Sequence, residues 1–223
     1  MCGVEGPGAR VRRGKKLRFL CPEHLHTKED RDKFLTRGEL GHLLAAARLS
    51  GPRDLALLWI CSVLGTRVSE LVELRRCDFN LEQGVAWIDV RKRGKRARLG
   101  RIYTVIPPAD LAPVKRWVQR FEGAAFIFPG QRGGSHMSTR AAQLVFKRCA
   151  AAAGVLAVRP KASIHALRHT RAVLLLEQTK DVQFVQKMLR HRSRASTEAY
   201  IHMLPGKFRE LTDKVSLLGG GGR

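Results

Sequence analysis

Hydrophobic residues recur along most of this chain at the three- to four-residue spacing of amphipathic helices. A capping box of Thr36 and Glu39 predicts a first helix that runs to about Arg48. A second helix is expected after Pro52, and a short third one from Arg67. Later helices are expected after residues 107–108 and over about 138–153, 164–178, 181–189, a short segment through 200, and 207–218.

The spacing changes in one region, where two strands are expected. Residues 85–90 and 99–106 predict an antiparallel pair, and Tyr103 in the return strand is expected to be half-buried. The turn between them is very basic, because seven of the eleven residues from Arg91 to Arg101 are Lys or Arg and none is acidic. The predicted class is therefore mainly α with a small antiparallel β-sheet, an α+β fold.

The whole chain carries a large positive excess. Its 223 residues include 42 Lys and Arg against 19 Asp and Glu, a formal charge of +23. This excess predicts a polyanionic partner and an affinity that falls with salt. A membrane surface fits less well, because the basic residues are spread through globular segments. We expect neither a signal peptide nor a transmembrane helix.

The cysteines are scattered, which fits a reducing compartment. Cys61 in an apolar helical run and Cys149 beside an alanine run are typical free core thiols. The spacing of Cys21, His24 and His26 matches no standard closed zinc site, so no metal is expected.

A set of arginine, histidine and tyrosine residues is suited to phosphodiester chemistry. Arg67 lies in G-T-R-V-S-E-L, His165 and Arg168 form an H-x-x-R, and His191 precedes Tyr200 by nine positions. Arginine forks can bind the oxygens of a phosphate, and a tyrosine can attack its phosphorus. Taken singly, each residue has a structural interpretation, such as an ion pair, a packed tyrosine or a satisfied core histidine. Their shared order and spacing favour the chemical one.

In these motifs the chain resembles the tyrosine recombinases, also called phage-type integrases. The resemblance rests on the motifs above and on F-L-T-R-G-E-L-G-H-L-L at residues 34–44, and it covers roughly residues 34–214. It implies the catalytic-domain fold of that family. It also implies a catalytic domain over 34–206. The Gly-rich and charged composition of residues 1–33 predicts a basic N-terminal arm, and the amphipathic spacing after Pro205 predicts a C-terminal helix and tail over 207–223.

The resemblance also assigns roles within the active site. Arg67 and Arg168 would neutralise the phosphate, and Tyr200 would attack it to form a covalent 3′-phosphotyrosine. His165 would take the tyrosine proton or bond the phosphate, and His191 would donate a hydrogen bond to it. The covalent bond conserves the energy for rejoining, so no cofactor is implied. The acidic residue three positions after the first arginine would brace it, and His169 is expected to point elsewhere.

The general acid implied by the resemblance is a lysine in the hairpin turn. The family's K-x-G-K matches Lys92 to Lys95, where Lys92 is preferred and Lys95 remains the alternative. The other basic side chains of the hairpin are expected to contact the DNA backbone. This group comprises Arg91, Arg93, Lys95, Arg96 and Arg98.

Three features depart from the family pattern. Arg190 stands where the family usually has the glycine of a left-handed turn at a helix end. The return strand of the hairpin is longer than usual. Only about 33 residues precede the catalytic domain, where many members carry a core-binding domain of about a hundred residues. The chain therefore resembles the short, catalytic-domain-only members, or a fragment of a longer enzyme.

The function predicted from these features is site-specific recombination of double-stranded DNA. The resemblance implies a homotetramer on DNA, in the cytoplasm of a bacterium or of the host of a mobile element. Two alternatives stay open: a type IB topoisomerase with the same tyrosine chemistry, and a non-catalytic DNA-binding regulator of the same fold. A detachable helix over 207–218 that docks on a neighbouring subunit would favour recombination.

Overall fold

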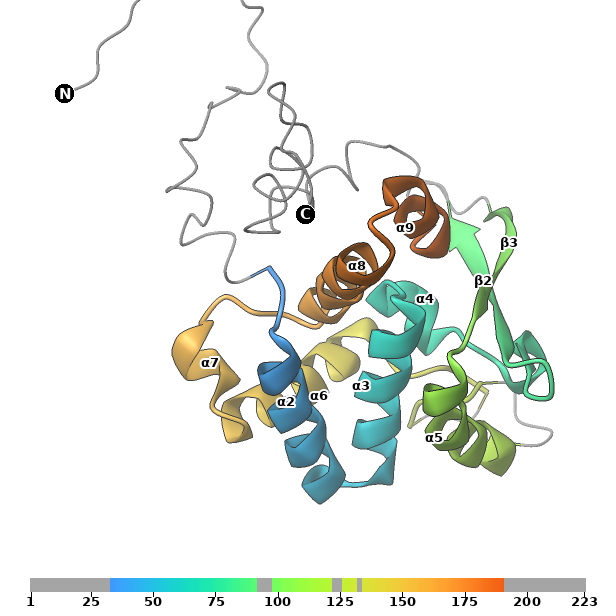
Figure 1. Ribbon diagram of the computed structural model, residues 1–223. Helices are drawn as coiled ribbons and strands as arrows, with labels where there is room; N and C mark the ends of the chain where they lie inside the picture. The colour runs from blue at the N-terminus through green and yellow to red at the C-terminus, as the bar shows by residue number, and fades with distance from the viewer. Residues whose placement is uncertain (1–32, 92–97, 122–125, 132–133, 191–223) are drawn as a thin grey trace, which may run out of the picture.

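A computed structural model describes residues 33–91, 98–121, 126–131 and 134–190. It confirms a mainly helical protein with a small antiparallel sheet. Figure 1 shows α3 (Pro52–Leu64) in the middle of the helical body, in contact with α2 (Arg37–Ser50), α5 (Pro108–Val118), α6 (Thr139–Ala152) and α8 (His165–Thr179). The other described elements are α4 (Val68–Val72), the 3-10 turns Arg76–Asp78 and Gln119–Phe121, β1 (Phe79–Asn80), β2 (Val85–Arg91), β3 (Arg98–Val105), α7 (Val155–Val158) and α9 (Val182–Met188).

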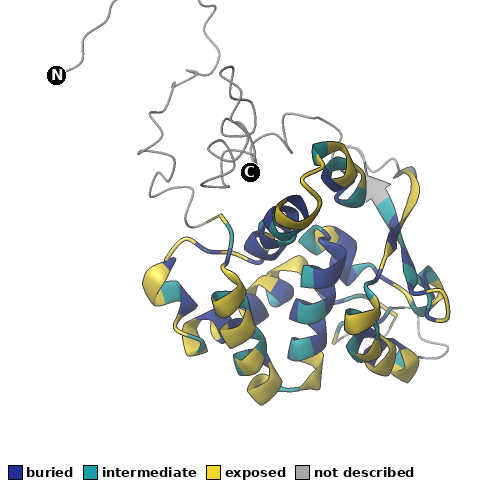
Figure 2. Ribbon diagram, viewed as in Figure 1, coloured by how far each residue is buried: buried dark blue, intermediate teal, exposed yellow. Residues whose placement is uncertain are grey.

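The helix starts follow their sequence signals. The Thr36 hydroxyl accepts a hydrogen bond from the Glu39 amide at 3.2 Å, and the Glu39 carboxylate accepts one from the Thr36 amide at 2.7 Å. This confirms the capping box of α2. Pro52 opens α3, whose apolar residues make it the most buried helix of the body (Figure 2), with Leu57 and Leu58 fully buried.

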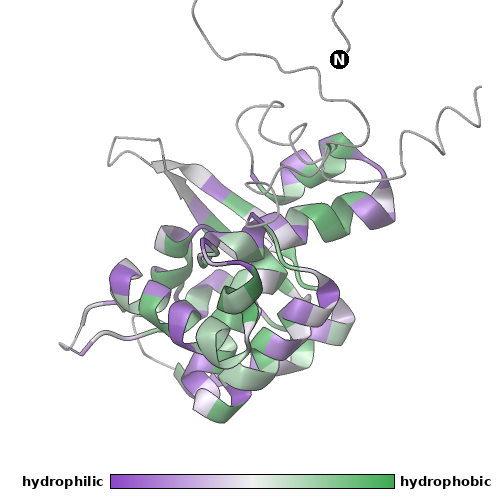
Figure 3. Ribbon diagram, turned by 90° about the vertical axis from the view of Figure 1, so that its left-hand side faces the viewer, coloured by the Kyte–Doolittle hydropathy of each residue, from purple (hydrophilic) through white to green (hydrophobic). Residues whose placement is uncertain are grey.

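The sheet has the order β1-β2-β3, and both pairings are antiparallel. Figure 3 shows the two long strands leaving the helical body together. Ala86 and Thr104 face each other in the register and are buried against the body. Since side chains alternate along a strand, the neighbouring Tyr103 points outward and is 64% exposed. The expectation of a half-buried Tyr103 is therefore wrong.

The last described helices form a second, smaller apolar cluster. Asp181 caps α9 by accepting hydrogen bonds from the amides of Gln183 and Phe184 at 2.8 and 3.0 Å. Residues of α8 and α9 pack together, among them Leu176 and Leu189. This packing brings the end of α9 back to the C-terminal end of α3, where the candidate site lies.

The thiols of Cys61 and Cys149 are buried in the core as expected, and burial raises the pKa of Cys61 to about 12. Cys21, His24 and His26 lie outside the described residues. In the part of the chain that the structure describes, no group of three or more His, Cys, Asp or Glu residues could hold a metal ion. No helix of that part has the length and apolar character needed to cross a membrane.

Candidate active site

The candidate site is built around the turn at Gly65, where α3 ends. Gly65 adopts a left-handed conformation with φ 57°, and its amide donates to the Cys61 carbonyl at 2.9 Å. A Cβ at this position would lie 2.5 Å from Cδ2 of Leu189, the residue that follows α9, so the Leu189 side chain would have to shift; the left-handed φ is what favours glycine here. Two residues after this turn, the chain presents Arg67 at the start of α4.

Arg67 and Glu70 form the pair that the sequence predicts. The Arg67 guanidinium donates from Nη1 to Oε1 of Glu70 at 2.7 Å, and the Arg67 amide donates to Oε2 of Glu70 at 2.9 Å. The Arg67 side chain is 40% exposed, whereas that of Glu70 is only 5% exposed. The buried carboxylate therefore fixes one edge of a guanidinium that remains accessible to an anion from solvent.

Arg168 reaches the same turn from α8. Its Nη1 donates to the Gly65 carbonyl at 2.6 Å, and its Nη2 donates to the Leu189 carbonyl. Nη1 also lies 3.9 Å from Oε2 of Glu70. The residue is 1% exposed, which makes it the largest fully buried side chain of the described protein. Arg168 thus joins α8, the end of α3 and the end of α9, and it places a second guanidinium beside Glu70.

His165 and His169 form an edge-on pair on α8, with ring centroids 4.5 Å apart. The prediction that His169 points elsewhere is wrong, because positions four apart share one side of a helix. His165 is exposed as a whole residue. Even so, desolvation of its ring by the surrounding protein, followed by the positive charges of Arg168 and Arg67, lowers its pKa. A neutral imidazole at pH 7 can accept a proton, as the predicted role requires.

For His169, burial and the neighbouring His165 lower the pKa to about 3. This imidazole is therefore neutral throughout the physiological range, so His165 has an uncharged ring as its neighbour.

Arg190 is a third arginine of this cluster, and the sequence interpretation gave it no role. The departure from glycine at this position was its only signal. Arg190 keeps the left-handed conformation, with φ 56°, and its Nη2 lies 3.7 Å from Oε2 of Glu70. Three guanidinium groups therefore surround one buried carboxylate.

Several predicted site residues lie outside the part of the chain that the structure describes. Of Arg91 and Arg98 it gives the backbone, since they end β2 and begin β3 and pair in its register. Arg101, the last residue of the basic run, forms ion pairs with Asp78 and Asp89, so its charge is neutralised by carboxylates of the protein itself. The residues outside the description are Lys92, Arg93, Lys95, Arg96, His191 and Tyr200.

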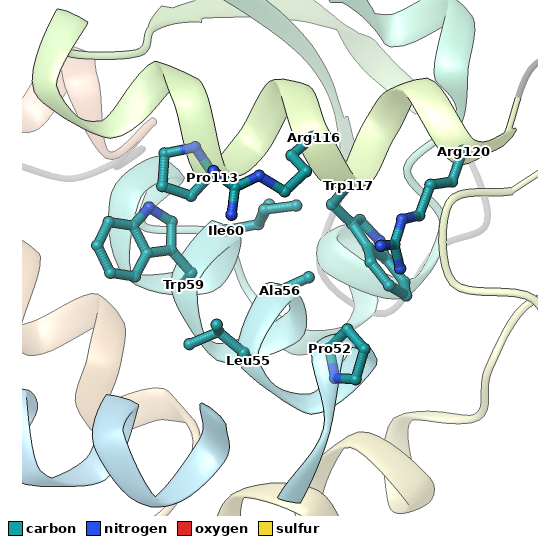
Figure 4. A pocket seen from close by; sticks show the side chains of 9 residues that line it. All are labelled: Pro52, Leu55, Ala56, Trp59, Ile60, Pro113, Arg116, Trp117 and Arg120. Atoms are coloured by element: carbon teal, nitrogen blue, oxygen red, sulfur yellow. The ribbon is translucent and has the colours of Figure 1, made fainter. Parts of the chain in front are cut away.

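A separate apolar groove of about 200 Å³ lies between α3 and α5 (Figure 4). Trp59 of α3 lies beside Pro113 of α5 at one end, and Trp117 lies with Arg120 at the other. None of the lining residues belongs to the cluster around Glu70 and Gly65, so the groove is a different feature from the candidate site.

Comparisons with known proteins find relatives of this chain. The model of the phage integrase family matches residues 33–206. Tyrosine recombinase XerC of Xanthomonas axonopodis pv. citri is 35% identical over 157 residues, which make up 69% of this chain and 48% of that protein. Tyrosine recombinase XerD of Pseudomonas putida is 32% identical over 193 residues, or 80% of this chain and 60% of that protein. The chain spans about half the length of the curated relatives it matches.

Solved structures show the same fold. The site-specific recombinase XerH, bound to its difH substrate before cleavage, aligns with a TM-score of 0.65 at 23% identity over 84% of this chain and 55% of that one. The catalytic domain of bacteriophage HP1 integrase aligns with a TM-score of 0.55 at 19% identity over 85% of this chain and 98% of that one. At these identities the likeness establishes the fold of the described body.

Proposed function

The chain belongs to the phage integrase family, and from this premise we propose that it is a site-specific DNA recombinase. It cleaves and rejoins double-stranded DNA through a covalent 3′-phosphotyrosine at Tyr200. The active species is an assembly on DNA, a homotetramer. The net charge of +23 fits a polyanionic substrate of this kind.

The observation that carries the proposal is the convergence of Arg67, His165 and Arg168 on one site. His165 and Arg168 lie on α8 and Arg67 lies at the start of α4, yet the charges of both arginines act on the His165 imidazole. Glu70 pairs with the Arg67 guanidinium and lies 3.9 Å from that of Arg168. Such a cluster of fixed cations beside a neutral imidazole suits a phosphate that gains charge during attack.

The reaction proceeds by in-line displacement at phosphorus. The Tyr200 hydroxyl gives up its proton to His165 and forms a bond to phosphorus, while the bond from phosphorus to the 5′ oxygen breaks. Lys92 donates a proton to that leaving oxygen, and Arg67 and Arg168 offset the charge on the non-bridging oxygens. A 5′ hydroxyl then attacks the phosphotyrosine, so the strand is rejoined without consuming ATP.

Trapping on nicked suicide DNA tests the proposal. After cleavage the short fragment that carries the 5′ hydroxyl diffuses away, so rejoining is prevented and the covalent adduct accumulates. The DNA attached to the protein can then be sequenced. We expect a denaturant-resistant adduct on a defined sequence, and rejoined products when two sites are supplied. Relaxation of any supercoiled plasmid without recombinants would instead indicate a topoisomerase. Binding without an adduct would indicate a regulator.

Lys92 is expected to be the acid that protonates the leaving group. In a DNA substrate with a bridging 5′ sulfur, the leaving group is a thiolate that needs no proton. This substrate should therefore restore cleavage to a Lys92→Ala variant. The Lys95→Ala variant, which removes the same charge three residues on, is the matched control and should gain nothing from the sulfur. Rates of single-turnover cleavage on the two substrates measure the effect. Rescue of Lys95→Ala instead would move the acid to Lys95.

The segment from residue 207 to the end is proposed to hold the assembly together. Its sequence places Phe208, Leu211, Val215 and Leu218 on one side of an amphipathic helix. Docking that side on the next subunit gives a head-to-tail contact that can close into a ring. A chain that ends at Pro205 should therefore lose recombination between two full sites by at least about tenfold, since closure needs every contact. Recombination that survives the deletion unchanged would contradict this role.

A further inference from the structure

We propose that Arg190 is a positioning residue of the active site, which clamps the end of α9 to the turn that carries Arg67. The inference rests on the proposed function, because its effect is on the rate of DNA cleavage. It concerns the residue that stands in place of the family's usual glycine.

The backbone of Arg190 gives the first indication. Its φ of 56° is left-handed, a conformation that is unfavourable for a residue with a Cβ and open to glycine. In the described chain one other residue that is not glycine, the exposed Lys180, has a positive φ. A glycine would make this turn without strain, so the arginine must be explained by its side chain.

That side chain is fully buried and binds main-chain carbonyls at the end of α3. Nη2 donates to the carbonyls of Leu64 and Gly65 at 3.2 and 3.3 Å, and Nη1 donates to that of Met188 at 3.1 Å. The final carbonyls of a helix lack partners within the helix and carry partial negative charge. Arg190 therefore caps α3 and ties it to the end of α9 in one step.

The same guanidinium also faces the carboxylate that aims Arg67. Oε1 of Glu70 is bonded to the Arg67 guanidinium, while Oε2 lies 3.7 Å from Nη2 of Arg190. With cations on both oxygens, the carboxylate has little freedom to rotate. Loss of Arg190 would remove the nearer of the two guanidinium groups beside Oε2 and leave that oxygen with the Arg67 amide and the more distant Arg168. The carboxylate, and with it the Arg67 guanidinium, would then be held less firmly in its orientation.

Keeping a cation here is costly. Loss of solvent around Arg190 lowers its pKa to about 10, even though Glu70 acts in the opposite direction. Its Nε is also buried without a hydrogen-bond acceptor among the described residues. Strain, desolvation and an unsatisfied donor coincide in one side chain beside the predicted catalytic arginines, which points to a role in the reaction. His191 follows directly in the sequence, so the clamp also fixes where the chain leaves α9.

Two substitutions separate the side chain from the backbone. Arg190→Gly removes the strain and the guanidinium together. Arg190→Lys keeps the left-handed side chain and its charge, but its single nitrogen cannot reproduce the two guanidinium nitrogens that bond Met188 on one side and Leu64 and Gly65 on the other. Lys180→Gly is the matched control, because it also removes one positive charge and one left-handed side chain at an exposed position. The measurements are melting temperature, affinity for DNA, and single-turnover cleavage at saturating DNA, with and without millimolar methylguanidinium.

We expect Arg190→Gly to bind DNA like the wild type and to cleave it about 10- to 100-fold more slowly, since small displacements of a positioned group have effects of that size. Methylguanidinium should recover part of the rate in this variant alone. The cleavage rate of Arg190→Lys should lie between those of Arg190→Gly and the wild type, and the rate of Lys180→Gly should match the wild type. If Arg190→Gly fails to fold, the cleavage rate of Arg190→Lys decides.

Cleavage at the wild-type rate by a folded Arg190→Gly, or by Arg190→Lys, would overturn the inference. Arg190 would then have no role beyond packing in the turn. A wild-type chain that forms no adduct would contradict the proposed function instead. The two failures are therefore distinguishable in one set of reactions.

Discussion

A chain carrying Tyr200→Phe is expected to bind DNA with wild-type affinity and to form no covalent adduct. The substitution removes one hydroxyl and changes neither the charge nor the volume of the side chain by much. The loss should be complete within detection, because in the proposed reaction the hydroxyl oxygen is the atom that bonds to phosphorus. Electrophoresis under denaturing conditions, after incubation with suicide DNA, measures the adduct, and a gel shift on the same DNA measures binding.

The chain supplies a matched control for this experiment. Tyr103 is the other of its two tyrosines, and it lies exposed on β3. Tyr103→Phe makes the same chemical change and should leave adduct formation unaltered. If Tyr200→Phe forms the adduct and Tyr103→Phe does not, the nucleophile is Tyr103 in the hairpin. An adduct that persists when both tyrosines are replaced in one chain would refute tyrosine attack altogether.

Most helices could be predicted from local signals in the sequence. The capping box at Thr36 needs partners three residues apart, and the α9 cap at Asp181 needs partners two and three residues apart. Such signals are complete within one turn of helix. By contrast, β1 was missed, because its two residues are a strand only through pairing with β2. The four-residue α7 after Gly154 was missed for a similar reason, since it is too short to show a helical period.

The same division between local and distant contacts explains what was foreseen of the site. The pair of Arg67 and Glu70 lies within one turn, so its ion pair could be predicted. The hydrogen bond from Arg190 to the Leu64 carbonyl joins residues 126 positions apart. No spacing rule reaches so far, and an arginine in a polar stretch ordinarily indicates a solvated surface. Burial of Arg168 was hidden in the same way, since its contacts with Gly65 and Glu70 also join distant parts of the chain.

The burial of Arg168 separates the outcomes expected for the two arginines that are proposed to bind the phosphate. Arg67→Ala and Arg168→Ala should each slow single-turnover cleavage by about 10²–10³, as for loss of a positioned oxyanion donor. Lysine at either position should recover little, because an ammonium cannot reproduce the planar fork. Arg48→Ala, at an exposed position on α2, removes the same charge and should cleave normally.

The two variants should differ in stability. Arg168→Ala removes the Arg168 donors from the buried carbonyls of Gly65 and Leu189 and leaves the Gly65 carbonyl with the longer bond from Arg190, a loss on the order of 3 kcal/mol. In a domain of this size that is roughly 10 °C in melting temperature. Arg67 is partly exposed, so Arg67→Ala should melt close to the wild type and isolate the chemical effect. If Arg67→Ala cleaves at nearly the wild-type rate while remaining folded, its accessible guanidinium is not the phosphate ligand. If Arg168→Ala melts like the wild type, the carbonyl contacts that join α3, α8 and α9 contribute little to the fold, and its role is purely in the reaction.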